Sequence, residues 1–216
     1  MVRALLIKEL REAAALLAVA LAAAVYVLTD LTGLDVFPLQ EPGGGGYPFI
    51  GDVFSNRLWL VCGVLAVALG LKQTAWEETR GTYDFLLHRP VPRRVLFGVK
   101  LAFGLVSVLA VGGLTVLTYA LWAAAPGSIP APFRWSMTAP MWLTLAAFPL
   151  IYLSAFLSGI RPARWFGTRL VPLAAGGAFA TAAGASVESW DFALFVLPAT
   201  AVTAAAVIYF VENRDY

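Results

Sequence analysis

Residues 101–125 read LAFGLVSVLAVGGLTVLTYALWAAA and carry no charged side chain. An α-helix rises about 1.5 Å per residue, so this stretch is long enough to cross a hydrocarbon core of about 30 Å. A single segment in lipid satisfies its backbone polar groups internally only as a helix. The stretch therefore predicts a membrane-spanning helix and an all-α fold.

Apolar stretches of spanning length occur elsewhere in the chain as well. Of the 216 residues, 60% are hydrophobic and 13% are charged, whereas about a quarter of the residues in a soluble domain are charged. We therefore expect a single transmembrane domain over residues 1–216. The predicted spans are residues 13–29, 54–72, 98–125, 138–160, 170–187 and 192–211.

The distribution of Lys and Arg predicts the orientation, because cytoplasmic loops retain positive charge during insertion. If the N-terminus lies in the cytoplasm, 13 of the 15 Lys and Arg residues fall inside, and Arg57 and Arg134 fall outside. We expect a multi-pass protein of the cytoplasmic membrane with both termini in the cytoplasm, and the alanine-rich composition favours a bacterial inner membrane.

The net charge is only +2, and the basic residues form no stripe, so we expect no nucleic-acid partner.

Residues 1–12 precede the first predicted span. They mix both charge signs with Leu6, Ile7 and Leu10 at helical spacing, a pattern typical of an amphipathic helix on the membrane surface. The basic residues followed by an apolar run could also be a cleaved signal peptide. Because residues 13–29 approach spanning length, we expect an uncleaved first span, and cleavage stays an open alternative.

Chemistry inside a membrane normally requires ionisable groups within the spans, since burying them is costly. The predicted spans carry charges only near their ends, at Arg57, Lys72 and Lys100. The lone histidine, His88, has no second histidine with which to share a metal, and the sequence contains no phosphate-binding loop. We expect no catalytic, cofactor or metal site in this chain, and any ATP-driven work would need ATP and Mg²⁺ in another polypeptide.

The predicted cytoplasmic loop, residues 73–97, is charged and amphipathic. Thr79, Tyr83 and Leu86 follow one another at helical steps, and Pro90 and Pro92 would end such a helix. The basic residues Arg93, Arg94 and Lys100 are then expected to anchor the next span at anionic headgroups. From these residues alone, an ordinary solvated loop and a docking element are equally open.

This loop resembles the membrane subunits of type-2 ABC (ATP-binding-cassette) exporters, the ABC-2 permease family. Those permeases carry, after the second span, an acidic residue, a Gly-Thr pair, a Leu-rich turn, a Pro-x-x-Arg region and a Lys that starts the third span. The corresponding residues here are Glu77 or Glu78, Gly81-Thr82, Phe85-Leu86-Leu87, Pro90-Val91-Pro92-Arg93 and Lys100. The N-terminal amphipathic helix, the six spans and the chain length belong to the same resemblance.

The resemblance implies a permease subunit that is not itself an enzyme. It would form the translocation pathway as a homo- or heterodimer with a second permease subunit, and separate ABC ATPase subunits would drive it. The resemblance implies a coupling helix that docks on the ATPase through Glu77, Glu78, Gly81, Thr82, Tyr83, Phe85 and Leu86.

Two departures from the family pattern mean that no substrate or transport direction follows from the resemblance. Many such exporters have re-entrant helices between spans five and six, where only about Ser186 to Asp191 is found here, and the long outer loop lies between spans one and two. An alternative function is a small membrane scaffold or assembly factor that recruits a cytoplasmic partner without transport.

Overall fold

A computed structural model describes residues 2–33, 49, 52–79, 92–128, 132–164, 167–185 and 189–213. Most of these residues are helical and none of them lies in a β-strand, so the all-α prediction is confirmed. The elements are α1 (Val2–Leu31), α2 (Asp52–Leu71), a π-helical turn (Lys72–Trp76), α3 (Glu77–Thr79), α5 (Arg93–Ala124), a 3₁₀ turn (Trp135–Thr138), α6 (Ala139–Ile160), α7 (Val171–Ala185) and α8 (Ser189–Asn213).

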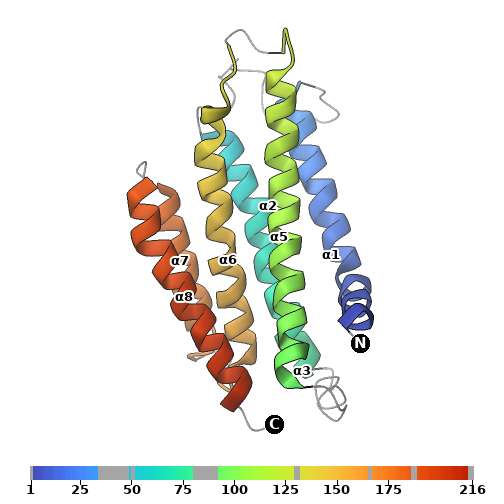
Figure 1. The fold of residues 1–216 in the computed structure, drawn as a ribbon, viewed down its shortest axis with the longest axis vertical. Coiled ribbons are helices and arrows are strands. Elements are labelled where there is room, and N and C mark those ends of the chain that lie inside the picture. The colour runs from blue at the N-terminus through green and yellow to red at the C-terminus, as the bar shows by residue number, and fades with distance from the viewer. Residues whose placement is uncertain are drawn as a thin grey trace.

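The helices form an elongated bundle around α6 (Figure 1). Helix α6 contacts α2, α5, α7 and α8, while α1 packs at one edge against α2 and α5. In the most apolar part of α6, 83% of the residues are buried, compared with 17% in α1. Helix α1 begins and α8 ends at the same end of the bundle, which we call the terminal end (Figure 1).

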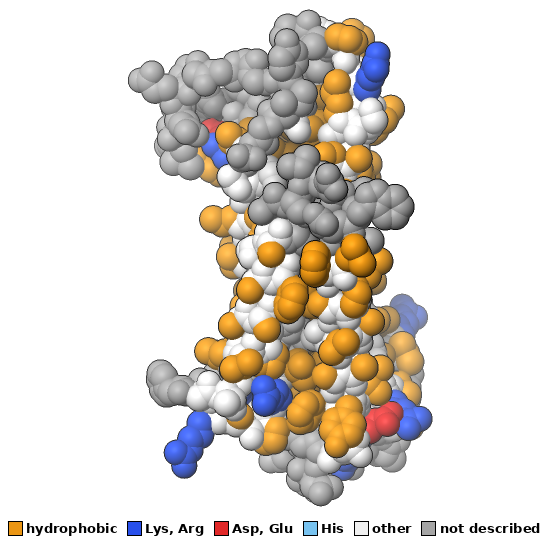
Figure 2. Space-filling model, turned by 90° about the vertical axis from the view of Figure 1, so that its left-hand side faces the viewer, with side chains coloured by type: hydrophobic (Ala, Val, Ile, Leu, Met, Phe, Trp, Pro, Cys, Tyr) orange, Lys and Arg blue, Asp and Glu red, His pale blue; other side chains and the backbone are white. Residues whose placement is uncertain are grey.

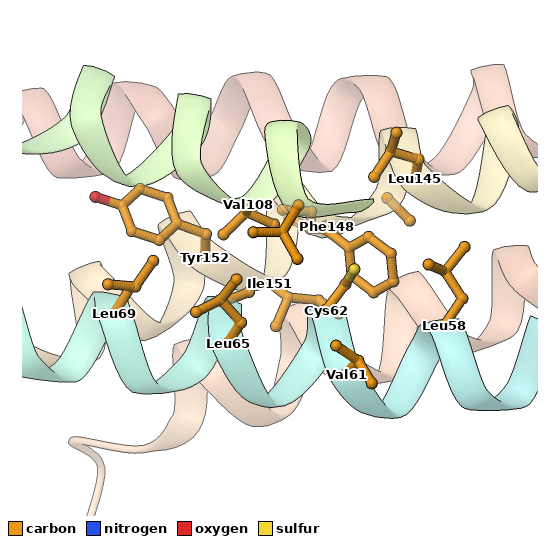
Figure 3. Close-up of a cluster of buried hydrophobic side chains, with 14 of the residues drawn as sticks. Leu58, Val61, Cys62, Leu65, Leu69, Val108, Leu145, Phe148, Ile151 and Tyr152 are labelled. Carbon is orange, nitrogen blue, oxygen red and sulfur yellow. The ribbon is translucent and has the colours of Figure 1, made fainter. Parts of the chain in front are cut away.

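The core lies between α2, α5 and α6. Apolar residues recur at three- and four-residue steps on α2, which places them on one face of the helix. Figure 3 shows Leu58, Val61, Cys62, Leu65 and Leu69 of α2 facing Val108 of α5 and Leu145, Phe148, Ile151 and Tyr152 of α6. At Gly112 of α5 an added Cβ would lie 2.4 Å from Leu145 Cδ1, so the absence of a side chain lets α5 and α6 approach closely.

The outer surface of the bundle is also apolar. Figure 2 shows hydrophobic side chains over the middle of one face, with Lys and Arg toward its two ends. Leu60 of α2 and Val202 of α8 are 68% and 70% exposed, which is typical of side chains that face lipid. Within the described residues, five helices are long and apolar enough to span a membrane: Val2–Leu31, Val53–Thr79, Arg93–Ala124, Trp135–Ile160 and Leu194–Asn213. These are the helices of a multi-pass membrane protein.

The predicted fifth span, residues 170–187, corresponds to α7, which is shorter than the other five. Its 15 residues cover about 22 Å at 1.5 Å per residue, less than a hydrocarbon core of about 30 Å. A count by helix length over the described residues therefore gives five spans and one short apolar helix.

Two differences from the predicted boundaries bear on the terminal end. Residues 1–12 were expected to form a separate helix, but from Val2 they continue into the first span as the single helix α1. The buried side of α1 runs through that junction, from Glu9 and Ala13 on to Val27. The second span was expected to end at residue 72, but its helix continues through the π-helical turn and α3 to Thr79.

Candidate functional site at the terminal end

Lys100 is the centre of a buried group of charges at the terminal end. It lies seven residues after the start of α5, and its side chain is 2% exposed. Its ammonium nitrogen Nζ lies 2.8 Å from Oε1 of Glu9 and 2.6 Å from Oε1 of Glu77. Lys100 therefore joins α5 to α1 and to α3. This finding corrects the prediction that Lys100 anchors at lipid headgroups: α5 begins at Arg93, which places Lys100 about two turns inside the bundle.

Gln73 and Tyr152 extend this group of charges into the core. Gln73 Nε2 donates hydrogen bonds to Oε2 of Glu9 at 3.0 Å and to the carbonyl oxygen of Lys100 at 3.1 Å. The Tyr152 hydroxyl donates to Oε1 of Gln73 at 2.6 Å. An added Cβ at Gly104 would lie 2.2 Å from that hydroxyl oxygen. The glycine on α5 thus leaves the space that the Tyr152 hydroxyl occupies.

The solvent side of the group is formed by Lys8 and Glu12 of α1. Lys8, with 31% of its side chain exposed, has its Nζ 3.1 Å from Oε1 of Glu77 and 3.3 Å from Oε1 of Glu12. The Lys72 ammonium donates to the backbone carbonyl of Glu12. We call the set Lys8, Glu9, Glu12, Gln73, Glu77, Lys100 and Tyr152 the ionic cluster. It links α1, the end of the second span, α5 and α6.

Three carboxylates of the ionic cluster lie close enough together to hold a cation. Oxygen atoms of Glu9, Glu12 and Glu77 are within 4.8 Å of one another. The ammonium groups of Lys8 and Lys100 already lie among these oxygens and offset two of the three negative charges. We therefore assign no metal site there.

The π-helical turn brings the end of α2 against α6. Thr74 donates its hydroxyl to the carbonyl oxygen of Gly70 at 2.6 Å. An added Cβ at Gly159 of α6 would lie 1.8 Å from Thr74 Oγ1, so this contact requires a residue without a side chain. Within and just after the turn, Gln73 and Glu77 are four residues apart and both buried. Single π-helical turns inside α-helices are frequent at functional sites.

A second ion pair holds α3 against the connection from α6 to α7. Arg169, 6% exposed, is paired with Glu78. The Arg169 guanidinium also donates to the carbonyl oxygens of Ser158 and Gly159 at 3.2 and 2.7 Å. These carbonyls lie at the end of α6, where helical acceptors lack intrahelical donors. Arg169 therefore both caps α6 and fixes the residue after Glu77.

The predicted docking residues fall into two groups. Glu77 is 5% exposed and faces lysines of its own chain, and its docking on a partner ATPase stays a prediction. Glu78 retains 37% side-chain exposure. The other predicted docking residues, Gly81, Thr82, Tyr83, Phe85 and Leu86, lie outside the described residues.

The two predicted anchors Arg93 and Arg94 lie at the start of α5 and are exposed. The Arg94 side chain is 77% exposed, and its Nε is 2.9 Å from Oε1 of Glu212 at the end of α8. Both positions leave the guanidinium groups accessible at the terminal end. Their predicted contact with lipid headgroups stays a prediction.

Sequence reasoning missed Glu9, Gln73, Tyr152 and Arg169 as members of the site. One usable signal lay in α1, because Glu9 is four residues before Ala13 and so shares the buried side of the first span.

Comparison with known proteins adds no further guide: no family model matches the chain, and no curated protein or solved structure matches it. The function is therefore argued from the residues of this chain.

Proposed function

We propose that this chain is the permease subunit of an ATP-binding-cassette exporter, which separate cytoplasmic ATPase subunits drive through the loop at residues 80–91. The observation that carries the proposal is the ion pair that closes the base of this loop. Glu77 and Lys100 flank the loop in sequence, and their charged atoms are 2.6 Å apart with side-chain exposures of 7% and 2%. The residues on either side of this segment are thus joined by a buried ion pair.

Such a base suits a segment that transmits force. Immediately before the loop, Glu77 binds Lys100 and Lys8, while Glu78 binds Arg169. Because these partners belong to α1, α5 and the α6 to α7 connection, a displacement of the loop would be transmitted to several helices at once. Burying an ion pair carries a desolvation penalty of several kcal/mol. A loop that only contacts water would not need buried ion pairs, with their desolvation penalty, beside it in the sequence.

The arrangement of the helices is consistent with six spans and two cytoplasmic termini. Helix α1 begins and α8 ends at the same end of the bundle, and an even number of crossings produces that result (Figure 1). We infer that α7 completes the count, since a bilayer can thin locally around a short helix at modest cost. The positive charges Lys8, Lys72, Arg94 and Lys100 gather near the terminal end, which would face the cytoplasm of a bacterial cell.

The proposal divides the work between chains. The permease would form the pathway as a dimer with a second permease subunit, either a copy of itself or a related chain. Two partner ATPase subunits would bind ATP and Mg²⁺, and the pair would close around the bound nucleotide. The loop at residues 80–91 would convert that closure into movement of the spans.

A pull-down in mild detergent followed by mass spectrometry tests this proposal. The native chain is compared with Gly81→Trp in the loop and with Val106→Trp, which places the same bulk on the lipid-facing side of α5, where Val106 is 65% exposed. We expect the native chain and Val106→Trp to retain an ABC ATPase and Gly81→Trp to lose it.

Two results would count against the proposal. Retention of the ATPase by Gly81→Trp would place the docking site elsewhere on the chain. Recovery of no ATPase with the native chain, under conditions that keep the membrane complex intact, would favour the scaffold or assembly factor instead.

A further inference from the structure

Helix α1 buries little of its apolar stretch in the bundle. It lies at the edge, contacts α2 and α5, and has 17% of its most apolar stretch buried. The apolar residues that it buries fully are small: Ala13, Ala20, Ala24 and Val27, while Leu16, Leu17, Leu28 and Leu31 pack against the core partly buried. In lipid, moving apolar side chains into a helix contact brings no hydrophobic gain, because lipid tails are equally apolar. Apolar burial therefore gives α1 van der Waals contact but no hydrophobic stabilisation.

Both ends of α1 carry ionic attachments instead. At the terminal end, Glu9 binds Lys100 at 2.8 Å and Lys8 binds Glu77 at 3.1 Å. At the opposite end, Asp30 is paired with Arg57 of α2, and the two side chains are 10% and 22% exposed. Glu9 and Asp30 are separated by about 32 Å along the helix at 1.5 Å per residue. The buried stripe of small residues lies between these two attachments.

We propose that α1 is a movable helix that is held on the bundle by two ionic clamps. The inner clamp is the pairing of Lys8 and Glu9 with Glu77 and Lys100, and the outer clamp is the Asp30–Arg57 pair. The small residues between the clamps present a smooth surface, which offers little resistance to a helix that rotates or lifts away. Opening one clamp lets α1 swing about the other, and opening both releases it from α2 and α5. This inference is independent of the proposed function.

The inner clamp is also placed to respond to the neighbouring loop. Glu77 and Gln73 lie on the segment that leads into residues 80–91, and both bind groups of the inner clamp. A shift of this segment would withdraw Glu77 from Lys8 and Lys100 and Gln73 from Glu9. The core contacts of α2 with α6 are made by other residues of α2, among them Leu58, Leu65 and Leu69 (Figure 3). Helix α1 can therefore be released while the central helices stay assembled.

Distances between paired spin labels in lipid nanodiscs test the proposal in the full chain with Cys62→Ala. One label pair, Leu10→Cys and Val106→Cys, reports on the inner part of the α1 and α5 contact, and a second, Val25→Cys and Leu121→Cys, reports on the outer part. These four side chains are 52%, 65%, 58% and 62% exposed, so labels there face lipid. A third pair, on Leu60→Cys of α2 and Leu197→Cys of α8, reports on the central bundle.

Each clamp is opened by neutral substitutions of similar shape. Lys8→Met and Glu9→Gln on α1, combined with Glu77→Gln and Lys100→Met, remove both pairs of the inner clamp. Asp30→Asn with Arg57→Met opens the outer clamp. The control is Arg94→Met, which breaks the exposed pair with Glu212 that joins α5 to α8.

The native chain and Arg94→Met should give one narrow distance for every label pair. Opening the inner clamp should add longer distances to the inner pair alone, and opening the outer clamp should add them to the outer pair alone. Opening both should broaden both α1 pairs while the α2 and α8 pair keeps its native distance.

Two results would overturn the proposal. If the variant with both clamps open keeps the native distances at both α1 pairs, apolar packing holds α1 and the clamps do not. If the α2 and α8 pair changes together with the α1 pairs, the charges hold the bundle as a whole, and α1 is not separately movable.

Discussion

Removal of the Lys100 ammonium is expected to cause the largest stability loss of any single charge deletion in this chain. Lys100→Met keeps the length of the side chain but leaves the carboxylates of Glu9 and Glu77 without their nearest cation. The three side chains are 2%, 5% and 7% exposed, so water screens the stranded charges poorly. Breaking a buried ion pair from one side costs about 3–5 kcal/mol. Since Lys8 still lies 3.1 Å from Glu77, we expect a loss of about 3 kcal/mol.

The assay is the free energy of unfolding in mixed detergent micelles, measured by denaturant titration. Arg94→Met serves as the control, because the exposed pair between Arg94 and Glu212 should contribute less than about 1 kcal/mol. Adding Glu9→Gln to Lys100→Met should restore part of the loss, since it removes one stranded carboxylate. A Lys100→Met variant that unfolds within about 0.5 kcal/mol of the native chain would refute the reasoning, because surface substitutions alone produce changes of that size.

Three further predictions use the same unfolding assay or amide exchange. Tyr152→Phe removes a buried hydroxyl from the ionic cluster and should cost about 1–2 kcal/mol of unfolding free energy; no loss would show that this hydrogen bond is unimportant. Gly104→Ala forces a Cβ to within 2.2 Å of the Tyr152 hydroxyl and should destabilise by about 1–3 kcal/mol. Gly98→Ala on the same helix, with no atom within 4 Å of the new Cβ, should be neutral or stabilising by up to about 1 kcal/mol; equal effects at the two glycines would contradict the packing described. Arg169→Met should speed amide exchange at residues 77–79, because it releases Glu78; unchanged exchange there would mean that the pair does not hold α3.

The helical fold could be predicted because the decisive signal is local. An uncharged run such as residues 101–125 has one stable conformation in lipid, whatever its neighbours are. The same criterion misplaced the end of the second span, because Lys72 and Gln73 resemble the start of a polar loop. In the structure the backbone stays helical to Thr79, and the polar side chains find partners on neighbouring helices. Hydropathy alone therefore could not locate this helix end.

The ionic cluster could not be predicted for a related reason. Glu9, Glu77 and Lys100 lie on three different helices, and their pairing depends on which helices are neighbours and how each is rotated. Periodicity describes one helix at a time and carries no such information. The sequence predicted Lys100 near a span end and suggested lipid headgroups as its partner, whereas α5 begins seven residues earlier, at Arg93. The actual partners became visible only with the arrangement of α1 beside α5.

A photo-crosslinking amino acid at Leu86, in the loop at residues 80–91, would test the proposed function most directly. The same amino acid at Leu60, which is 68% exposed on the lipid-facing side of α2, serves as the control. After irradiation of intact cells and purification in denaturant, mass spectrometry identifies the proteins attached to each position. The proposal predicts an ABC ATPase attached at Leu86 and none at Leu60. Efficient crosslinking from Leu86 to proteins of other classes, with no ATPase among them, would contradict it.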